Sequence, residues 1–175
     1  MPSPDPYGSD SSGPALPGPV LSLAVQYAST AQNLPTRAQI RRWLLAALDQ
    51  NAEITVRIVD LEEAQTLNRD YRHKDYPTNV LTFEYGDIDQ HDNGNGVLGG
   101  DIVICAGVVA KEAAELGKKL IEHYAHLTIH GALHLQAYRH EDEADAVIME
   151  AREAAILKRF RIANPYLANN FTHGA

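Results

Sequence analysis

Three histidines in the second half of the chain have a spacing that is typical of a catalytic metal site. His130, His134 and His140 are residues 1, 5 and 11 of the segment HGALHLQAYRH. The first interval places two imidazoles on one face of a helix, one turn apart. The second interval is too long for that face, so the chain must leave the helix and fold back to bring His140 close. Three imidazoles that converge in this way leave a fourth metal position open, as in catalytic zinc sites.

The same spacing occurs in zinc proteases with the motif H-E-x-x-H-x-x-G-x-x-H. Here Gly131 stands where a peptidase needs its glutamate base, which argues against peptide hydrolysis. A competing ligand set exists, because His126, His130 and His134 share one helical face. Side chains on consecutive turns point nearly parallel and would not readily surround one ion. We therefore interpret His126 as a residue that packs in the core or contacts a metal ligand.

Length and composition predict one soluble domain. The chain has 175 residues, 45% of them hydrophobic and 22% charged, which is ordinary for a globular protein. The single cysteine, Cys105, excludes an intramolecular disulfide and favours a reducing compartment. No run approaches the roughly 20 apolar residues that span a bilayer, and the N-terminus does not have the pattern of a secretory signal. We expect a cytoplasmic protein that does not bind membranes.

Charge alone does not decide whether the protein binds nucleic acid. The formal net charge of −8 argues mildly against non-specific binding, but phosphate binding depends on a local patch. Basic residues cluster in one segment, with two lysines as a second contributor: Arg69, Arg72, His73 and Lys74, then Lys118 and Lys119. Acidic residues gather later, at Glu141, Asp142, Glu143, Asp145, Glu150 and Glu153. Either cluster could equally be a solvated face.

Residue periodicity predicts an α+β domain over residues 20–165. Period-two alternation indicates strands at 20–27, 53–59, 80–85 and 101–105. Helices are expected from Thr36 to about 47, from Asp60 to about 71, and at 106–116, 120–136 and 141–160. This order implies a four-stranded sheet with helices mainly on one side. In the last helix we expect an inward face of Val147, Ile148, Ala151, Ala155, Ile156 and Phe160.

The two ends and one internal segment differ from this domain in composition. Residues 1–19 hold six of the nine prolines and no long apolar segment, so we expect a disordered arm. Residues 86–96 consist of turn formers and predict a connection between strands. A short tail is expected at 166–175. The helix at 120–136 is apolar nearly all round and should be central. Burying its histidines is costly unless their nitrogens are satisfied, and a metal ion would satisfy them.

Four segments follow one another in the chain: LNRDYRHKD at 67–75, PTNVLTF at 77–83, LGGDIVIC at 98–105, and residues 126–140. In these segments the chain, from about residue 20 onward, resembles the YbeY family of bacterial rRNA-maturation endoribonucleases. The resemblance implies a single zincin-like domain with a mixed sheet. It also implies one zinc ion, or another divalent metal, on His130, His134 and His140. The implied activity is metal-dependent cleavage of single-stranded RNA, in 3′ processing of small-subunit rRNA and in ribosome quality control.

The resemblance also suggests roles outside the histidines. The family has a functional arginine that matches Arg72, whose guanidinium could clamp a phosphate bidentately; alternatively, Arg72 forms a structural salt bridge. Arg69 and Lys74 are weaker candidates for RNA binding. Asp101 either caps a turn or orients a metal ligand or Arg72. The expected partners are single-stranded rRNA, the small ribosomal subunit and its assembly factors, and not DNA.

Two residues depart from the family motif HGxLHLxGYDH. Ala137 replaces a glycine, which would cost on the order of 1 kcal/mol if the position needs positive φ. Arg139 replaces an aspartate, and partners of ligand histidines tune metal affinity by ~10–100-fold. Two alternatives therefore remain: a metallohydrolase of another substrate, and a ribosome-associated binding factor with a mainly structural metal. The nucleophile also stays open, between a metal-activated water and the RNA 2′-hydroxyl.

Overall fold

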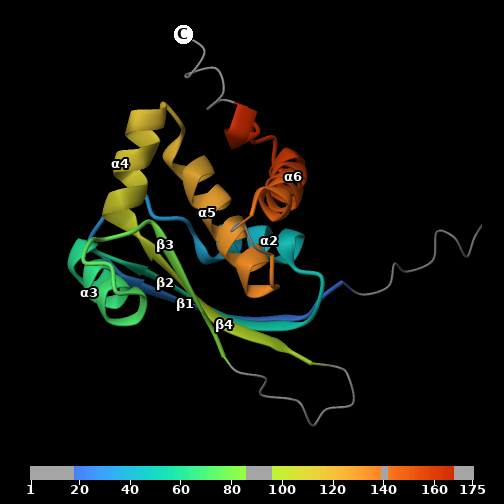
Figure 1. Ribbon diagram of the computed structural model, residues 1–175, viewed down its shortest axis with the longest axis horizontal. Coiled ribbons are helices and arrows are strands. Elements are labelled where there is room, and N and C mark those ends of the chain that lie inside the picture. The colour runs from blue at the N-terminus through green and yellow to red at the C-terminus, as the bar shows by residue number, and fades with distance from the viewer. Residues whose placement is uncertain (1–17, 86–95, 139–141, 168–175) are drawn as a thin grey trace, which may run out of the picture.

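The computed structural model describes residues 18–85, 96–138 and 142–167. The order of elements along these residues confirms the predicted pattern of strands and helices (Figure 1). Their bounds are β1 Leu21–Ala28, α2 Arg37–Ala47, β2 Ala52–Val59, α3 Leu61–Arg72, β3 Val80–Glu84, β4 Leu98–Cys105, α4 Ala106–Leu116, α5 Leu120–Leu135 and α6 Glu143–Arg159. Residues 1–17 of the expected arm lie outside the described residues, as does most of the 86–96 connection.

The sheet is mixed, as predicted, with the strand order β1-β2-β4-β3. Strands β1, β2 and β4 run parallel to one another, and β3 runs antiparallel to β4. Strand β3 therefore forms one edge of the sheet. The backbone N–H and C=O groups of Leu81, Phe83 and Tyr85 bond to β4. The same groups of Val80, Thr82 and Glu84 therefore point outward, away from β4.

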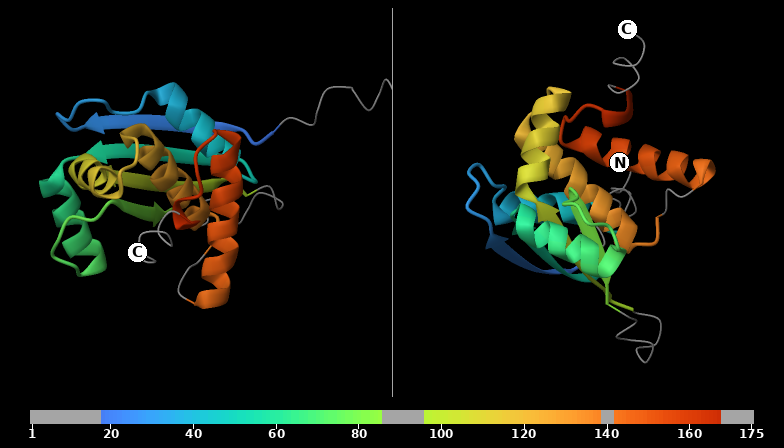
Figure 2. Two further views of the ribbon diagram at one scale, coloured as in Figure 1. Left: turned by 90° about the horizontal axis from the view of Figure 1, so that it is seen from above. Right: turned by 60° about the vertical axis from the view of Figure 1, so that its left-hand side comes forward.

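The helices lie mainly on one face of the sheet, which confirms the predicted layering. Helices α2, α5 and α6 cover one face, whereas α3 covers the other (Figure 2). Strand alternation separates the two cores. On β4, Ile102 and Ile104 belong to the core beneath α2 and α5, whereas Val103 and Cys105 belong to the smaller core beneath α3.

Helix α5 is the central helix, and two glycines let it lie directly against the sheet. A Cβ atom on Gly100 of β4 would stand 2.6 Å from Leu135 Cδ2. A Cβ atom on Gly131 of α5 would stand 3.0 Å from Ile102 Cγ2. Most residues of α5 are buried. The helix that carries the histidines is therefore fixed close to β4 and to the edge strand β3.

Local signals set most helix ends. Thr36 forms a capping box with Gln39 at the start of α2, and Gly117 ends α4 with φ 65°. Asp60 is the N-cap residue of α3, as predicted, but its side chain makes no capping bond. It accepts a hydrogen bond from the Ser29 hydroxyl instead, and so ties α3 to the end of β1.

The predicted inward face of α6 is wrong in its first half. Val147 and Ile148 are 61% and 58% exposed, and Ala151 and Ala155 are exposed as well. The buried positions are Met149, Glu153, Ile156 and Leu157. The prediction failed because it placed only apolar residues inside, whereas a glutamate occupies the centre of the true inner face.

Arginine side chains contact the outward carbonyls of both edge strands. From α2, Arg37 donates to the Leu23 carbonyl at 2.9 Å and Arg41 donates to the Leu21 carbonyl at 3.2 Å, both on β1. At the other edge, Arg72 Nη2 donates to the Thr82 carbonyl of β3 at 2.7 Å. The last residue of α3 is thereby fastened to the edge strand.

Candidate active site

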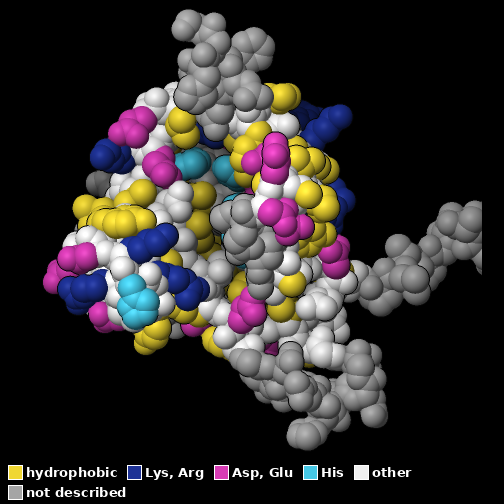
Figure 3. Space-filling view, in the orientation of Figure 1, with side chains coloured by type: hydrophobic (Ala, Val, Ile, Leu, Met, Phe, Trp, Pro, Cys, Tyr) yellow, Lys and Arg dark blue, Asp and Glu magenta, His cyan; other side chains and the backbone are white. Residues whose placement is uncertain are grey.

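A cleft of about 660 Å³ opens beside the edge strand β3. Its walls are the end of α3, the following loop, the outward side of β3, and two histidines of α5. In the space-filling view, histidine side chains lie in a hollow near the centre of this face (Figure 3). Lysine and arginine side chains gather over α3 on one side of the hollow, and acidic side chains lie along α6 on the other.

His130 and His134 line this cleft from successive turns of α5. Their ring centroids are 4.9 Å apart and the rings are nearly perpendicular, which brings two imidazoles into one small region as the spacing predicted. His140 and Arg139 lie outside the described residues. The third ligand therefore stays a prediction.

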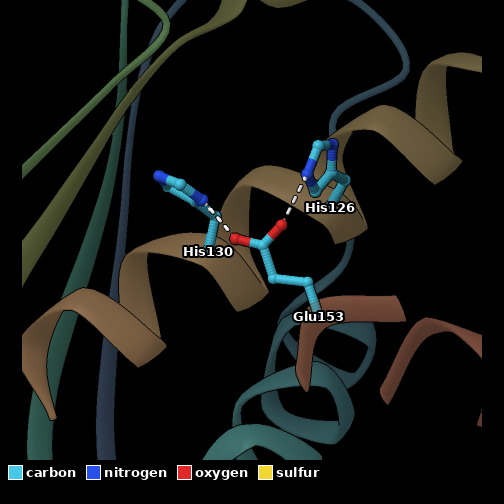
Figure 4. Close-up of side chains that lie close together, drawn as sticks. All are labelled: His126, His130 and Glu153. Atoms are coloured by element: carbon cyan, nitrogen blue, oxygen red, sulfur yellow. Dashed lines mark hydrogen bonds and ion pairs between the residues drawn. The ribbon is translucent and has the colours of Figure 1, made fainter. Parts of the chain in front are cut away.

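Glu153 of α6 is the residue at this site that sequence reasoning missed. Its side chain is fully buried, with 0% exposure. One carboxylate oxygen accepts a hydrogen bond from His130 Nδ1 (Figure 4). The other accepts from His126 Nε2 at 3.2 Å and from the Tyr166 hydroxyl. The only sequence signal is its helical spacing, four residues after Met149 and three before Ile156, which places it on an inward face.

These hydrogen bonds keep the Glu153 carboxylate ionised. Burial would raise its pKa, but the hydrogen bonds and charges of His126 and His130 outweigh burial and lower the pKa to about 2. Tyr166 shows the converse effect, because burial and the neighbouring carboxylate both raise the pKa of its hydroxyl. Tyr166 was expected to begin the tail, and its contact with Glu153 shows that the packed domain extends to this residue.

The residues present fit a metal ion in two arrangements. His126, His130 and Glu153 offer ligand atoms within 4.8 Å of one another, so they form one candidate metal site. The second arrangement uses His130 and His134, the two histidines that line the cleft. In it, His130 Nδ1 is bonded to Glu153, so the ligand atom of His130 is Nε2, which points away from Glu153 (Figure 4).

His126 contacts Glu153, the neighbour of the candidate ligand His130, and its interpretation as a packing residue or a contact of a metal ligand stays a prediction. It bonds Glu153 at 3.2 Å, and its ring lies 6.3 Å from the ring of His130, edge to face. Its own ring packs 5.8 Å from Tyr166. His126 thus reaches His130 through Glu153 and is not among the residues that line the cleft.

The basic residues of the candidate RNA surface separate into two groups. Arg72 and Lys74 line the cleft. The Arg72 guanidinium lies 5.3 Å from the centre of the Phe83 ring. One of its five N–H groups donates a hydrogen bond to the Thr82 carbonyl. Arg69 pairs with Asp70 at 3.3 Å and does not line the cleft. Of these three basic residues, only Arg72 and Lys74 line the cleft.

Asp101 lies within β4, on the face of the sheet opposite the histidines of α5. It stands opposite Phe83 in the β3–β4 ladder and shares a strand face with Val103, on the side that α3 covers. The histidines of α5 lie across the sheet. The Asp101 carboxylate accepts a hydrogen bond from the Tyr85 hydroxyl, which raises the pKa of Tyr85. Asp101 therefore does not contact the histidines, and its proposed link to Arg72 stays a prediction.

A side chain at Gly131 would have to displace its neighbours by a few tenths of an ångström. Its Cβ direction points at Ile102 Cγ2, 3.0 Å away, with Thr82 Cγ2 at 3.4 Å. A longer side chain at this position would press on β4 and the edge strand.

Asn79, from the PTNVLTF segment, joins β3 to the helices above it. Its side-chain amide donates to Glu112 of α4 at 3.1 Å, and Glu112 bonds His123 of α5 at 3.0 Å. His123 is buried, and burial lowers its pKa despite the carboxylate. This second carboxylate–histidine pair holds the start of the edge strand against α4 and α5.

Comparison with known proteins agrees with the geometry. A family model described as Endoribonuclease YbeY matches residues 25–161. The chain belongs to this family. Endoribonuclease YbeY of Thiobacillus denitrificans is 66% identical over 148 residues, which cover 85% of this chain and 97% of that protein. Endoribonuclease YbeY of Nitrosospira multiformis is 51% identical over 166 residues, which cover 90% of this chain and 88% of that protein.

The solution structure of TM1509 from Thermotoga maritima is also similar, with a TM-score of 0.49 and 21% identity. That similarity covers 79% of this chain and 91% of the other. Within the described part of the chain, no helix is both long enough and apolar enough to cross a membrane. The match to the YbeY model spans the histidine helix, the edge strand and Glu153.

One departure from the YbeY motif has a visible structural cost. Ala137 adopts φ 73°, the left-handed region that favours glycine. Its N–H donates to the His134 carbonyl at 3.1 Å, and the N–H of Tyr138 donates to the Leu133 carbonyl at 3.1 Å. These two bonds form the Schellman ending of a helix, in which the left-handed residue is usually glycine. The alanine therefore occupies the turn that leads toward residue 140.

Restoring glycine at this turn should stabilise the protein. We expect Ala137→Gly to raise the free energy of unfolding by about 1 kcal/mol, because the Cβ clash of a left-handed alanine disappears. For a chain of this size that corresponds to a melting temperature about 2–4 °C higher. Ala151→Gly, at an exposed position inside α6, is the matched control and should destabilise by about 1 kcal/mol. Equal destabilisation by both changes would show that the turn carries no strain.

Proposed function

We propose that the chain is a zinc-dependent endoribonuclease specific for single-stranded RNA. Membership of the YbeY family makes it an endoribonuclease, a hydrolase that acts on RNA. The observation that carries the finer proposal is that His130 and His134 line the same cleft as Arg72. The proposed role is maturation of the 3′ end of small-subunit rRNA and ribosome quality control in the cytoplasm, with the small subunit and its assembly factors as partners.

The proposed metal ligands are His130, His134 and His140. When bound, a zinc ion supplies a Lewis acid for the phosphodiester and lowers the pKa of a water nucleophile. The histidines hold the ion, and the helix α5 that carries two of them is fixed to the sheet by Gly131 and Gly100. Across the cleft, Arg72 can turn its remaining donors to two oxygens of the scissile phosphate and stabilise the charge that develops there. Lys74 would contact a neighbouring phosphate.

The alternatives receive less support. A peptidase needs a base at position 131, where a side chain would meet Ile102. A binding factor with a structural metal would not need an open cleft beside the ligands, yet His130 and His134 face a cleft of about 660 Å³.

Metal content and cleavage, measured on the same preparation, test the proposal. Elemental analysis of metal-replete protein should find one zinc per chain. Labelled single-stranded RNA should be cut, whereas the same sequence as duplex RNA or as DNA should not. A chelator should abolish cleavage and added zinc should restore it. Protein without stoichiometric metal, or cleavage that survives chelation, would refute the zinc-dependent mechanism.

A substrate with one 2′-deoxy nucleotide at the scissile position identifies the nucleophile. If the 2′-hydroxyl attacks, this substrate should resist cleavage and the normal product should end in a 2′,3′-cyclic phosphate. If water attacks, the deoxy substrate should be cut at a similar rate. Either result is compatible with the roles proposed for His130, His134 and Arg72.

A further inference from the structure

We infer that Glu153 is a positioning residue for the metal ligand His130. The inference rests on the proposed metal site and adds a residue to it from α6, in a part of the chain that the histidine motif does not include. Glu153 would fix the orientation and the tautomer of the His130 ring, and His126 and Tyr166 would hold Glu153 in place. None of these three residues lines the cleft.

The contacts of Glu153 leave it one orientation. Its carboxylate is 0% exposed and receives N–H groups from two imidazoles, one on each oxygen. The Tyr166 hydroxyl donates to the oxygen that His126 also contacts. A carboxylate accepts and cannot donate, so these bonds require a proton on His130 Nδ1. A ring protonated at Nδ1 can coordinate a metal only through Nε2.

The position of Glu153 relative to the cleft decides against direct metal ligation. A catalytic ion must keep a coordination position open to substrate, and the residues that line the cleft from α5 are His130 and His134. Glu153 lies on the inner side of His130, and Nε2 of that ring points away from it (Figure 4). The carboxylate thus stands behind the ligand and makes the ring a more basic donor.

The zinc affinity of the Glu153→Gln variant tests the inference. An amide offers one acceptor oxygen and one NH2 group in place of two acceptor oxygens, so one imidazole loses its acceptor and the negative charge beside His130 is removed. We expect the zinc dissociation constant, measured by competition with a chromogenic chelator, to rise ~10–100-fold. Tyr166→Phe, which removes one hydrogen bond and keeps the ring beside His126, should raise it several-fold. Glu143→Gln, an exposed change on the same helix, should leave it within twofold.

A measurement on the unmutated protein covers the case in which Glu153→Gln does not fold. Nitrogen-15 spectra of the zinc-loaded chain should show His130 protonated at Nδ1 and bound through Nε2. A zinc-bound His130 Nδ1 would overturn the inference and indicate that Glu153 and His126 are direct ligands. Complete loss of zinc from a folded Glu153→Gln variant would lead to the same conclusion. An unchanged dissociation constant in Glu153→Gln would also overturn it. If the unmutated chain itself binds no zinc, the proposed metal site fails first, and the inference with it.

Discussion

His134→Ala should lose its metal ion and its RNA cleavage together. Ligand removal sacrifices a large share of a binding free energy that is on the order of 10 kcal/mol or more for zinc held by protein ligands. Stoichiometric zinc should therefore disappear from the purified variant, and cleavage should fall to the level of the chelator-treated parent. Elemental analysis and single-turnover cleavage of a labelled single-stranded RNA measure the two losses on one preparation.

His73→Asn is the matched control for metal content. His73 is exposed and has φ 59° at the end of α3, and asparagine tolerates this backbone conformation. The variant should keep one zinc per chain. If His134→Ala also retained its zinc, the ligand set would exclude His134, and the alternative cluster of His126, His130 and Glu153 would become the metal site.

Arg72→Ala should leave the fold and the metal content intact while cleavage falls by ~10²–10³-fold. That is the usual cost of losing a donor that stabilises charge in a transition state. Its bond to the Thr82 carbonyl is made at the exposed rim, so its loss should cost little stability. Arg72→Lys should restore little activity, because an ammonium cannot grip two phosphate oxygens in one plane. Single-turnover rates, with zinc content measured in parallel, separate this effect from loss of the ion.

Arg69→Ala provides the comparison for Arg72. Arg69 lies one turn earlier on α3 and carries the same charge, but it pairs with Asp70 and does not line the cleft. Its replacement should change the cleavage rate by no more than a few-fold. Similar losses in both variants would indicate general attraction of RNA by the basic surface, and a parental rate in Arg72→Ala would assign that arginine a structural role.

Periodicity and spacing were sufficient to predict the framework of the molecule. Alternation located the strands, the apolar circumference of residues 120–136 identified the central helix, and the interval between His130 and His134 placed both rings in one cleft. The positive φ of Ala137 was also foreseeable, because the motif has glycine there and the helix must end. In each case the signal lies within a few neighbouring residues.

The missed features depend on contacts between distant segments. In the sequence, Glu153 looks like part of a solvated acidic helix. In the fold, α6 packs against α5, and hydrogen bonds from two imidazoles offset the free-energy cost of burying the carboxylate. The same packing exposes Val147 and Ile148, which hydrophobicity alone had placed inside. The position of Asp101 required one further step, because its strand was predicted but the face that α5 covers was not.

The arginines at the two sheet edges also bear on how the protein behaves in solution. An uncovered edge strand is a template for strand addition by another copy of the chain and hence for aggregation. Arg37 and Arg41 occupy outward carbonyls on β1, and Arg72 occupies the Thr82 carbonyl on β3. On β3, the side chain that occupies the outward carbonyl, Arg72, is also the proposed phosphate ligand. Because Arg72 can keep this bond while its other N–H groups bind a phosphate, the β3 edge would stay protected from a second copy of the chain when RNA is bound.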